Sequence, residues 1–297
     1  MKTARRFFLW VFLAATTLAL LGQGRPLPLQ TDSVRFAVIG DSGTGKLPQY
    51  EIAEKMNFSR QTFPFDFVIM LGDNIYGGNN ASDYRKKFEL PYKLLLDAGV
   101  KFYAAIGNHD SPTQKSYKPF NMNGQAYYTY KKGNVEFFVL DSGYMNPLQL
   151  AWLEKELQNS KADWKVCYFH HALYSSGAFH GSAVELRLVL EPLFIKYGVD
   201  VVFAGHEHMY ERMKPQHGID YFTEGASGEL RQGNLRKSDL TAFGFDLDRT
   251  FMLVEISGNE LSFQTISRPG KTIDSGVIQR RVSESGARGL ARPVSSP

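Results

Sequence analysis

The sequence has little of what would stabilise a small secreted scaffold or anchor a membrane protein. Its 297 residues include a single cysteine, Cys167, which cannot form a disulfide within the chain. Stability must therefore come from packing or from a bound metal. The longest apolar run, Phe7–Leu21, falls short of the roughly 20 residues that a membrane-spanning helix needs. With 43% apolar and 22% charged residues, the composition excludes disordered, collagen-like and coiled-coil proteins.

The central part of the chain has no excess of basic residues, although the whole chain carries a formal charge of +4. Residues 1–24 contribute +3 and residues 268–297 contribute +4, which leaves about −3 on residues 25–267. A body of that sign does not attract nucleic acid, so we expect no nucleic-acid scaffold as a partner.

The N-terminus has the pattern of an export signal. Basic Lys2, Arg5 and Arg6 precede the apolar run, and small Gly22 and Gly24 follow it. Residues 1–24 are predicted to be a signal peptide, the alternative being a retained N-terminal anchor. The Arg5-Arg6 pair resembles a twin-arginine signal. The protein is thus expected to be exported, periplasmic or secreted, without stable membrane insertion once the signal is removed.

Strands and helices are predicted to alternate through the first 205 residues, which favours an α/β fold with a largely parallel sheet. Further hairpins indicate a second, mixed sheet packed against the first. Residues 225–246 lack periodicity and are predicted to form a long surface loop. We expect one catalytic domain over 25–267 and a basic, disordered tail over 268–297. The expected strands are 34–39, 66–71, 101–106, 127–130, 135–140, 164–169, 199–204, 219–223, 250–256 and 261–266, and the expected helices are 48–62, 83–97, 147–159 and 184–197.

Polar side chains follow five of these strands at the point where each strand ends. The five segments are Gly40–Gly43, Gly72–Tyr76, Gly107–Asp110, His170-His171 and Gly205–His208. In a parallel α/β sheet the carboxyl ends of the strands share one edge, so these segments should converge. Two Asp, an Asn and several His form an oxygen- and nitrogen-rich ligand set for hard or borderline metals. A bridging carboxylate such as Asp73 would allow two metals to bind.

Each segment alone is a weak indication, because Gly-Asp and Asn-His are common in turns. Six of the seven histidines nevertheless fall in or near these strand ends, His180 among them. The residues Gly40–Lys46 also match the first seven positions of a P-loop. Leu47 stands where a P-loop needs Ser or Thr, and Pro48 follows it, so binding of nucleotide phosphates by this segment is disfavoured.

At these residues the sequence resembles the calcineurin-like metallophosphoesterases, and within them the purple acid phosphatases. The blocks GDxG, GDxxY, GNH[DE], VxxH and GHxH of that branch have counterparts in order over residues 34–267. Cys167 stands where the branch has Val, and His171-Ala172 replaces its His-x-Pro continuation. The resemblance implies a four-layer αββα sandwich with two mixed sheets, in the short, tartrate-resistant form.

The resemblance also implies a role for each matching residue. Asp41, Tyr76 and His208 would bind a ferric ion. Asn108, His170 and His206 would bind a divalent iron, zinc or manganese ion, with Asp73 bridging the two. His109 and His180 would contact the phosphate as catalytic residues. His170 is favoured over its neighbour His171 as the ligand, because it completes the fourth block.

The implied activity is that of an exported acid phosphatase, in which a metal-bound hydroxide attacks phosphomonoesters in line. Two alternatives stay open: a phosphodiesterase acting on nucleotides or glycerophosphodiesters, and a metal- or phosphate-binding protein without turnover. Tyr76 could also merely pack beside a site holding zinc or manganese. Substrate specificity would lie in loops 77–82, 111–126 and 225–246, which carry no readable motif. The partner is expected to be a small phosphoester, and the oligomeric state is not predicted.

Overall fold

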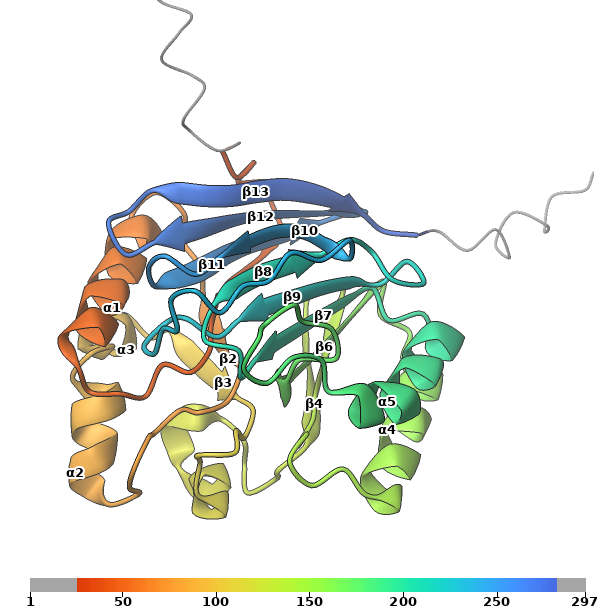
Figure 1. The fold of residues 1–297 in the computed structure, drawn as a ribbon, viewed down its shortest axis with the longest axis horizontal. Coiled ribbons are helices and arrows are strands. Elements are labelled where there is room, and N and C mark those ends of the chain that lie inside the picture. Colours follow the sequence, from red (N-terminus) through yellow and green to blue (C-terminus); the bar gives the residue numbers. More distant parts are fainter. Residues whose placement is uncertain (1–25, 282–297) are drawn as a thin grey trace, which may run out of the picture.

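The computed structural model describes residues 26–281, which form two β-sheets facing each other between layers of helices (Figure 1). The six-stranded sheet has the order β13-β12-β11-β1-β2-β3, and the seven-stranded sheet has the order β10-β8-β9-β7-β6-β5-β4. The strands of the first sheet are β1 (Val34–Ile39), β2 (Phe67–Met70), β3 (Lys101–Ala104), β11 (Thr250–Ser257), β12 (Glu260–Ser267) and β13 (Thr272–Gln279). Those of the second are β4 (Tyr128–Lys132), β5 (Val135–Val139), β6 (Trp164–His171), β7 (Val201–Gly205), β8 (Tyr210–Met213), β9 (Asp220–Glu224) and β10 (Thr241–Phe245).

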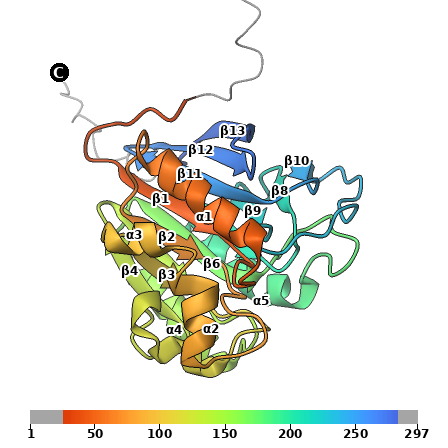
Figure 2. The same cartoon turned by 90° about the vertical axis from the view of Figure 1, so that its left-hand side faces the viewer.

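Helices cover the outer face of each sheet. Helices α1 (Leu47–Arg60), α2 (Ala81–Tyr84) and α3 (Lys93–Asp97) lie on the six-stranded sheet, with α1 in front of it in Figure 2. Helices α4 (Pro147–Asn159) and α5 (Val184–Tyr197) lie on the seven-stranded sheet. None of the helices within residues 26–281 is both long and apolar enough to cross a membrane.

Three apolar clusters separate the four layers. One joins α1 to the outer face of the first sheet, through Ile52 and Met56. A second fills the space between the sheets, where Phe36, Phe67 and Phe137 pack as stacked and edge-on aromatic pairs. The third joins α4 and α5 to the second sheet. The predicted αββα sandwich with two mixed sheets is confirmed.

The parallel strands do not form one sheet, as the alternation of strands and helices had suggested. Strands β1, β2 and β3 run parallel in the first sheet, whereas β5, β6, β7 and β9 run parallel in the second. The β4–β5 hairpin begins the second sheet. Strand alternation indicates parallel pairing but not which strands share a sheet, so the expectation of a common edge was wrong. The five polar segments instead meet where the carboxyl ends of parallel strands from the two sheets lie next to each other.

The helix expected over 83–97 is interrupted. Helix α2 continues into a π-helical turn, η1 (Arg85–Glu89), in which the N–H of Leu90 donates to the carbonyl of Arg85. Pro91 then lacks the N–H that an unbroken helix would use, and α3 begins only at Lys93. Two short 3₁₀ turns, η2 (Pro112–Ser116) and η3 (Lys118–Phe120), were not predicted.

Two predictions for the C-terminal third were wrong. Residues 225–246 are not simply a surface loop, because Ala226, Ser227 and Asn234 are buried and β10 ends the segment. The proposed tail over 268–297 contains β13, which pairs with β12. Its Asp274 is buried against Arg212, with Oδ2–Nε and Oδ1–Nη2 distances of 2.8 and 3.0 Å. The basic and polar residues around it concealed this strand, although Ile273 and Ile278 pack against the cluster between the sheets. The signal peptide at 1–24 and the tail beyond residue 281 lie outside the described residues.

Candidate metal centre

Three of the predicted metal ligands have an unusual backbone conformation. Asp41, Asp73 and His206 have φ values of 52°, 53° and 71°, in the left-handed region that residues other than glycine rarely adopt. Each directly follows a glycine at the end of a parallel strand. Such strain persists where the surrounding structure enforces it, and it concentrates at functional sites. These strand ends are therefore built to point particular side chains inward.

The glycines of the blocks allow the loops to approach one another closely. A Cβ on Gly107 would lie 2.2 Å from Oδ1 of Asp73, and one on Gly205 would lie 2.5 Å from Oδ2 of Asp41. Any larger residue at either position would push a predicted ligand out of place.

One group of predicted ligands gathers around Asp41. The hydroxyl of Tyr76 lies 3.1 Å from Oδ1 of Asp41 and 3.3 Å from Nε2 of His208. Nε2 of His208 lies 3.3 Å from the same Asp41 oxygen. Asp41, Asp73 and His208 each offer a ligand atom, and these atoms lie within 4.8 Å of one another. A single cation could contact all three.

The second group gathers around the fully buried His170. Its Nε2 lies 2.9 Å from Oδ1 of Asn108, 3.1 Å from Nδ1 of His206 and 3.5 Å from Oδ1 of Asp73. Nδ1 of His170 lies 2.9 Å from the carbonyl of Leu71, which orients the ring. Asp73 thus lies between the two groups, where a bridging carboxylate is expected.

His171 lies beside this cluster, with its ring centroid 4.4 Å from that of His206 and 5.0 Å from that of His170. Its Nδ1 lies 2.8 Å from the hydroxyl of Ser142, whose oxygen also accepts from the main-chain N–H groups of His170 and His171. Of the two adjacent histidines, His170 has its Nε2 within 3.5 Å of atoms of three other predicted ligands, whereas the ring of His171 forms its hydrogen bond with Ser142.

Burial gives these groups pKa values far from those of exposed side chains. Burial followed by the charge of Asp41 raises the pKa of the Tyr76 phenol. Burial together with the neighbouring histidines lowers the pKa of His206 to about 2. Burial also raises the pKa of Asp73, and the charge of Asp41 adds to that effect. Concentrating two carboxylates in a dry site is costly unless cations offset their charge.

The donor set suits two cations. Carboxylate, phenol, amide and imidazole groups converge from both sheets, and no thiol takes part, because Cys167 is buried in the cluster beneath α4 and α5. Oxygen and nitrogen donors of this kind suit iron, zinc and manganese. The two groups share Asp73, as a binuclear site requires.

The predicted catalytic histidines lie at the margin of the cluster. The main-chain N–H of His109 donates to Oδ1 of Asp73 at 2.9 Å, and its ring centroid lies 5.1 Å from that of Tyr76. The ring of His180 lies 3.9 Å from that of His206, centroid to centroid. Both rings thus lie against side chains of predicted metal ligands.

Several supporting residues were not assigned a role from the sequence. The half-buried Asp110 accepts hydrogen bonds from the main-chain N–H groups of Gly107 and Ile75 and from the side chain of Asn74, at 2.9 to 3.0 Å. Burial followed by the charge of Asp73 raises the pKa of Asp110 to about 6. The sequence signal for this supporting role was the position of Asp110 as the last residue of the third block.

The buried Glu207 ties the remaining loops together. Its Oε1 accepts from the main-chain N–H groups of His180 and Gly181, at 2.8 and 2.5 Å, and its Oε2 accepts from the side chain of Asn234. Glu207 thereby fixes the segment that carries His180. Glu207 stands between the two histidines of the fifth block in the sequence. The motif itself gave it no role.

Comparison with known proteins agrees with this geometry. Residues 34–210 match the family model described as calcineurin-like phosphoesterase. The chain belongs to this family. As a calcineurin-like phosphoesterase, it is a metal-dependent phosphoester hydrolase, and the family resemblance stated from the sequence is confirmed.

Curated relatives of this phosphoesterase include acid phosphatases of the purple branch. It is 29% identical to purple acid phosphatase 17 of Arabidopsis thaliana, over 70% of this chain and 72% of that one. It is 27% identical to tartrate-resistant acid phosphatase type 5 of Mus musculus, over 84% of this chain and 92% of that one.

Solved structures share the fold of this phosphoesterase. The purple acid phosphatase PPD1 of yellow lupin (Lupinus luteus) superposes with a TM-score of 0.71 at 20% identity, covering 91% of this chain and 58% of the lupin chain. GAP50, described as the anchor in the inner membrane complex of Plasmodium, superposes with a TM-score of 0.73 at 20% identity, over 85% of this chain and 90% of that one. An anchor protein on the same fold shows that activity has to be argued from the site residues.

Proposed function

We propose that this phosphoesterase is an acid phosphatase that hydrolyses phosphomonoesters at a binuclear metal centre. The observation that carries the proposal is the convergence of two ligand groups on the shared carboxylate of Asp73. Its relatives among the purple and tartrate-resistant acid phosphatases support the same reaction.

Asp41, Tyr76 and His208 would hold a ferric ion, and Asn108, His170 and His206 would hold a divalent iron, zinc or manganese ion. A phenolate oxygen such as that of Tyr76 favours a trivalent cation, which would also remove the phenol proton against the effect of burial. When bound, the cations supply Lewis-acid activation of water and offset charge on the phosphoryl oxygens during in-line displacement.

The protein's own side chains supply orientation and proton transfer. Asp73 positions His109, because it accepts a hydrogen bond from the main-chain N–H of that residue. Glu207 positions His180 through the main chain in the same way. We assign to the ring nitrogens of His109 and His180 the contacts with the phosphate and the donation of a proton to the leaving alkoxide.

The proposal includes the chain outside the described residues. Residues 1–24 would direct export, so that the mature enzyme acts in the periplasm or outside the cell. The catalytic domain would extend through β13 rather than end at residue 267, since β13 completes the first sheet.

The decisive experiment is a metal analysis of protein purified without added metal, followed by a substrate panel between about pH 4 and pH 9. We expect two metal ions per chain, and faster hydrolysis of p-nitrophenyl phosphate than of bis-p-nitrophenyl phosphate, with an acid optimum. Much faster hydrolysis of the diester would make the protein a phosphodiesterase. Bound metals without turnover at any pH would make it a binding protein.

A further inference from the structure

Arg231 has a guanidinium group whose hydrogen-bond donors are unused. Within residues 26–281 its side chain forms no hydrogen bond or salt bridge, and its Nη1 is buried without a partner. Its main chain, by contrast, is fixed, because the N–H of Arg231 donates to the carbonyl of His208 at 2.9 Å. A buried donor left unpaired is costly in free energy and calls for an explanation.

The guanidinium is nevertheless held in place. It stacks on the ring of Phe179, with 3.6 Å between Cζ and the ring centroid. Phe179 is fixed in turn, because its main-chain N–H donates to Oδ1 of Asn234 at 3.0 Å. Stacking orients a planar guanidinium without using any of its N–H groups.

Two acidic side chains of neighbouring segments, Glu229 and Glu207, already have other partners. Oε1 of Glu229 pairs with Nζ of Lys46 at 2.9 Å. Both carboxylate oxygens of Glu207 accept hydrogen bonds from His180, Gly181 and Asn234. The positive charge of Arg231 is therefore not offset by a contact within the described protein.

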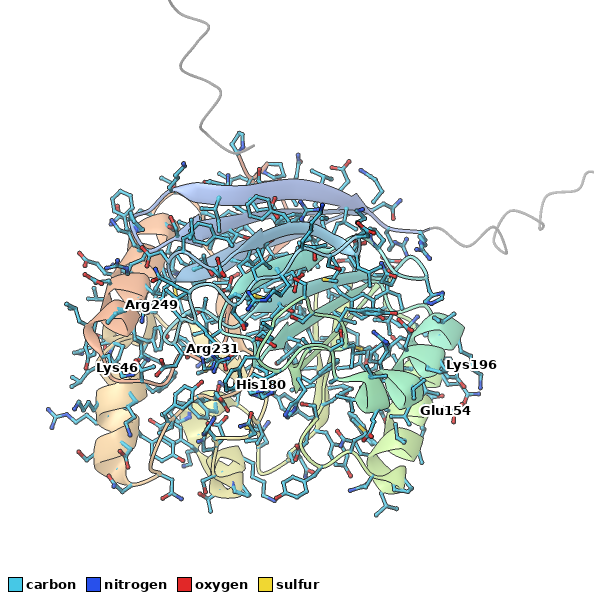
Figure 3. All side chains as sticks on the ribbon, in the orientation of Figure 1. Lys46, Glu154, His180, Lys196, Arg231 and Arg249 are labelled. Carbon is cyan, nitrogen blue, oxygen red and sulfur yellow. The ribbon has the colours of Figure 1, made fainter. Side chains whose placement is uncertain are left out.

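Arg231 also adjoins the candidate metal centre. In Figure 3 it lies next to His180 in the middle of the molecule, whereas Lys46 and Arg249 lie nearer to α1. The Phe179 ring that supports it contacts the His180 ring edge-on at 4.6 Å, and His180 lies against His206. Burial lowers the pKa of His180, and the charge of Arg231 lowers it further.

We propose that Arg231 binds a second anionic group of the substrate, beside the phosphate that the metal centre and His180 hold. The inference rests on the proposed function and gives the substrate class as compounds with two neighbouring phosphates. Arg231 contacts Phe179, Phe179 contacts His180, and His180 contacts His206. On this basis we assign the guanidinium to a group beside the reacting phosphate. Arg231 thus acts on specificity rather than on bond cleavage.

Hydrolysis of pyrophosphate illustrates the reaction. The oxygen of one water forms a bond to one phosphorus, and the bond from that phosphorus to the bridging oxygen breaks. The departing phosphate keeps the bridging oxygen and its electron pair and takes up a proton, and two phosphate ions result. Arg231 would bind the departing phosphate before and during this step.

The test compares Arg231→Ala with wild type in the metal-loaded protein. Steady-state kinetics use pyrophosphate and p-nitrophenyl phosphate, and calorimetry measures the binding of methylenediphosphonate and methylphosphonate. Charge-assisted hydrogen bonds are about twice as strong as neutral ones. We therefore expect Arg231→Ala to raise KM for pyrophosphate at least about tenfold and to change KM for p-nitrophenyl phosphate less than about threefold. The preference for the diphosphonate should fall by the same factor.

Lys237→Ala is the matched control, since Lys237 is an exposed cation on the same loop, and it should leave both preferences unchanged. Arg231→Lys keeps the charge but lacks the planar guanidinium, so it should retain part of the preference for the two-phosphate compounds. This variant also provides a test if Arg231→Ala does not fold. Equal losses for both substrates would place Arg231 on the reacting phosphate and overturn the proposal, as would no loss for either. A metal-loaded protein without turnover would refute the proposed function alone, because the phosphonate-binding ratio still tests Arg231.

Discussion

The main-chain N–H of His109 donates a hydrogen bond to Oδ1 of Asp73, 2.9 Å away, and so links the ends of β2 and β3. The same Asp73 oxygen lies 3.5 Å from Nε2 of His170, at the end of β6 in the opposite sheet. One carboxylate is therefore positioned to bind metal and to orient a candidate proton donor, and its loss should affect both.

Asp73→Ala should abolish turnover while the protein remains folded. Losing the shared carboxylate should lower kcat by at least ~10³, the scale of a single catalytic group. Activity and metal content would be measured together, with the exposed Asp97→Ala as the control. A variant that binds both metals and keeps more than about a tenth of wild-type activity would contradict the bridging role.

His170→Ala and His171→Ala should differ in metal content. His170 lies among the predicted ligands, whereas His171 pairs with Ser142. We expect His170→Ala to lose one metal per chain and His171→Ala to retain both, as measured by elemental analysis. The opposite result would assign the ligand role to His171.

His180→Ala should lower kcat most for substrates with poor leaving groups. Proton donation matters when the departing alkoxide is basic and matters little for an activated phenol. The measurement compares an alkyl phosphate with p-nitrophenyl phosphate, and the largely exposed His217→Ala is the control. Equal losses for the two substrates would indicate that His180 positions the phosphate instead.

Tyr76→Phe should remove a visible absorption band. A phenolate bound to ferric iron gives ligand-to-metal charge transfer, which the other predicted ligands do not provide. The wild-type protein should therefore be purple or pink, and Tyr84→Phe should leave that colour unchanged. A colourless wild-type protein holding two metals other than iron would contradict the ferric assignment and the acid optimum, although two divalent ions could still support hydrolysis.

The stability of the fold should depend on pH through Asp200. Burial raises the pKa of Asp200 to about 6, although the carboxylate accepts a hydrogen bond from the main-chain N–H of Lys165 at 2.8 Å. Because the folded state holds this proton more tightly than the unfolded chain, the contribution is greatest at low pH. It is lost as the pH rises through about 6.

Asp200→Asn keeps the hydrogen-bond acceptor and cannot ionise. Relative to wild type, its free energy of unfolding should be similar near pH 4 and higher by about 1–3 kcal/mol above pH 7. Urea unfolding across this range measures the difference, and the exposed Asp239→Asn should show no such trend. A difference that does not vary with pH would refute the role of Asp200.

Local sequence predicted much of the fold because most elements have a periodic apolar pattern. Helix α4 begins at Pro147 and ends at Asn159, as expected from the proline near its start. The pattern could not assign parallel strands to one sheet or the other, since that depends on packing between distant segments. It also missed β13, in which the buried Asp274 pairs with Arg212 between the partly buried Ile273 and Ile278.

The site residues that belong to one of the five sequence blocks could be predicted. Site residues outside these blocks could not. The seven predicted ligands each follow a strand, and the structure brings them together. Arg231 and Ser142 have no motif around them, and their contacts with Phe179 and His171 arise only in the folded chain. The roles of all these residues stay predictions until the variants are measured.

The meeting of two sheets at one cluster of ligands has a consequence for how the protein holds together. Asp41, Asp73 and Asn108 follow strands of one sheet, whereas His170, His206 and His208 come from the other. Cations bound there would crosslink the halves of the sandwich, which could not separate without releasing them. Metal availability would then enter the folding equilibrium itself, so that supply of the ion controls how long the enzyme survives as well as how fast it works.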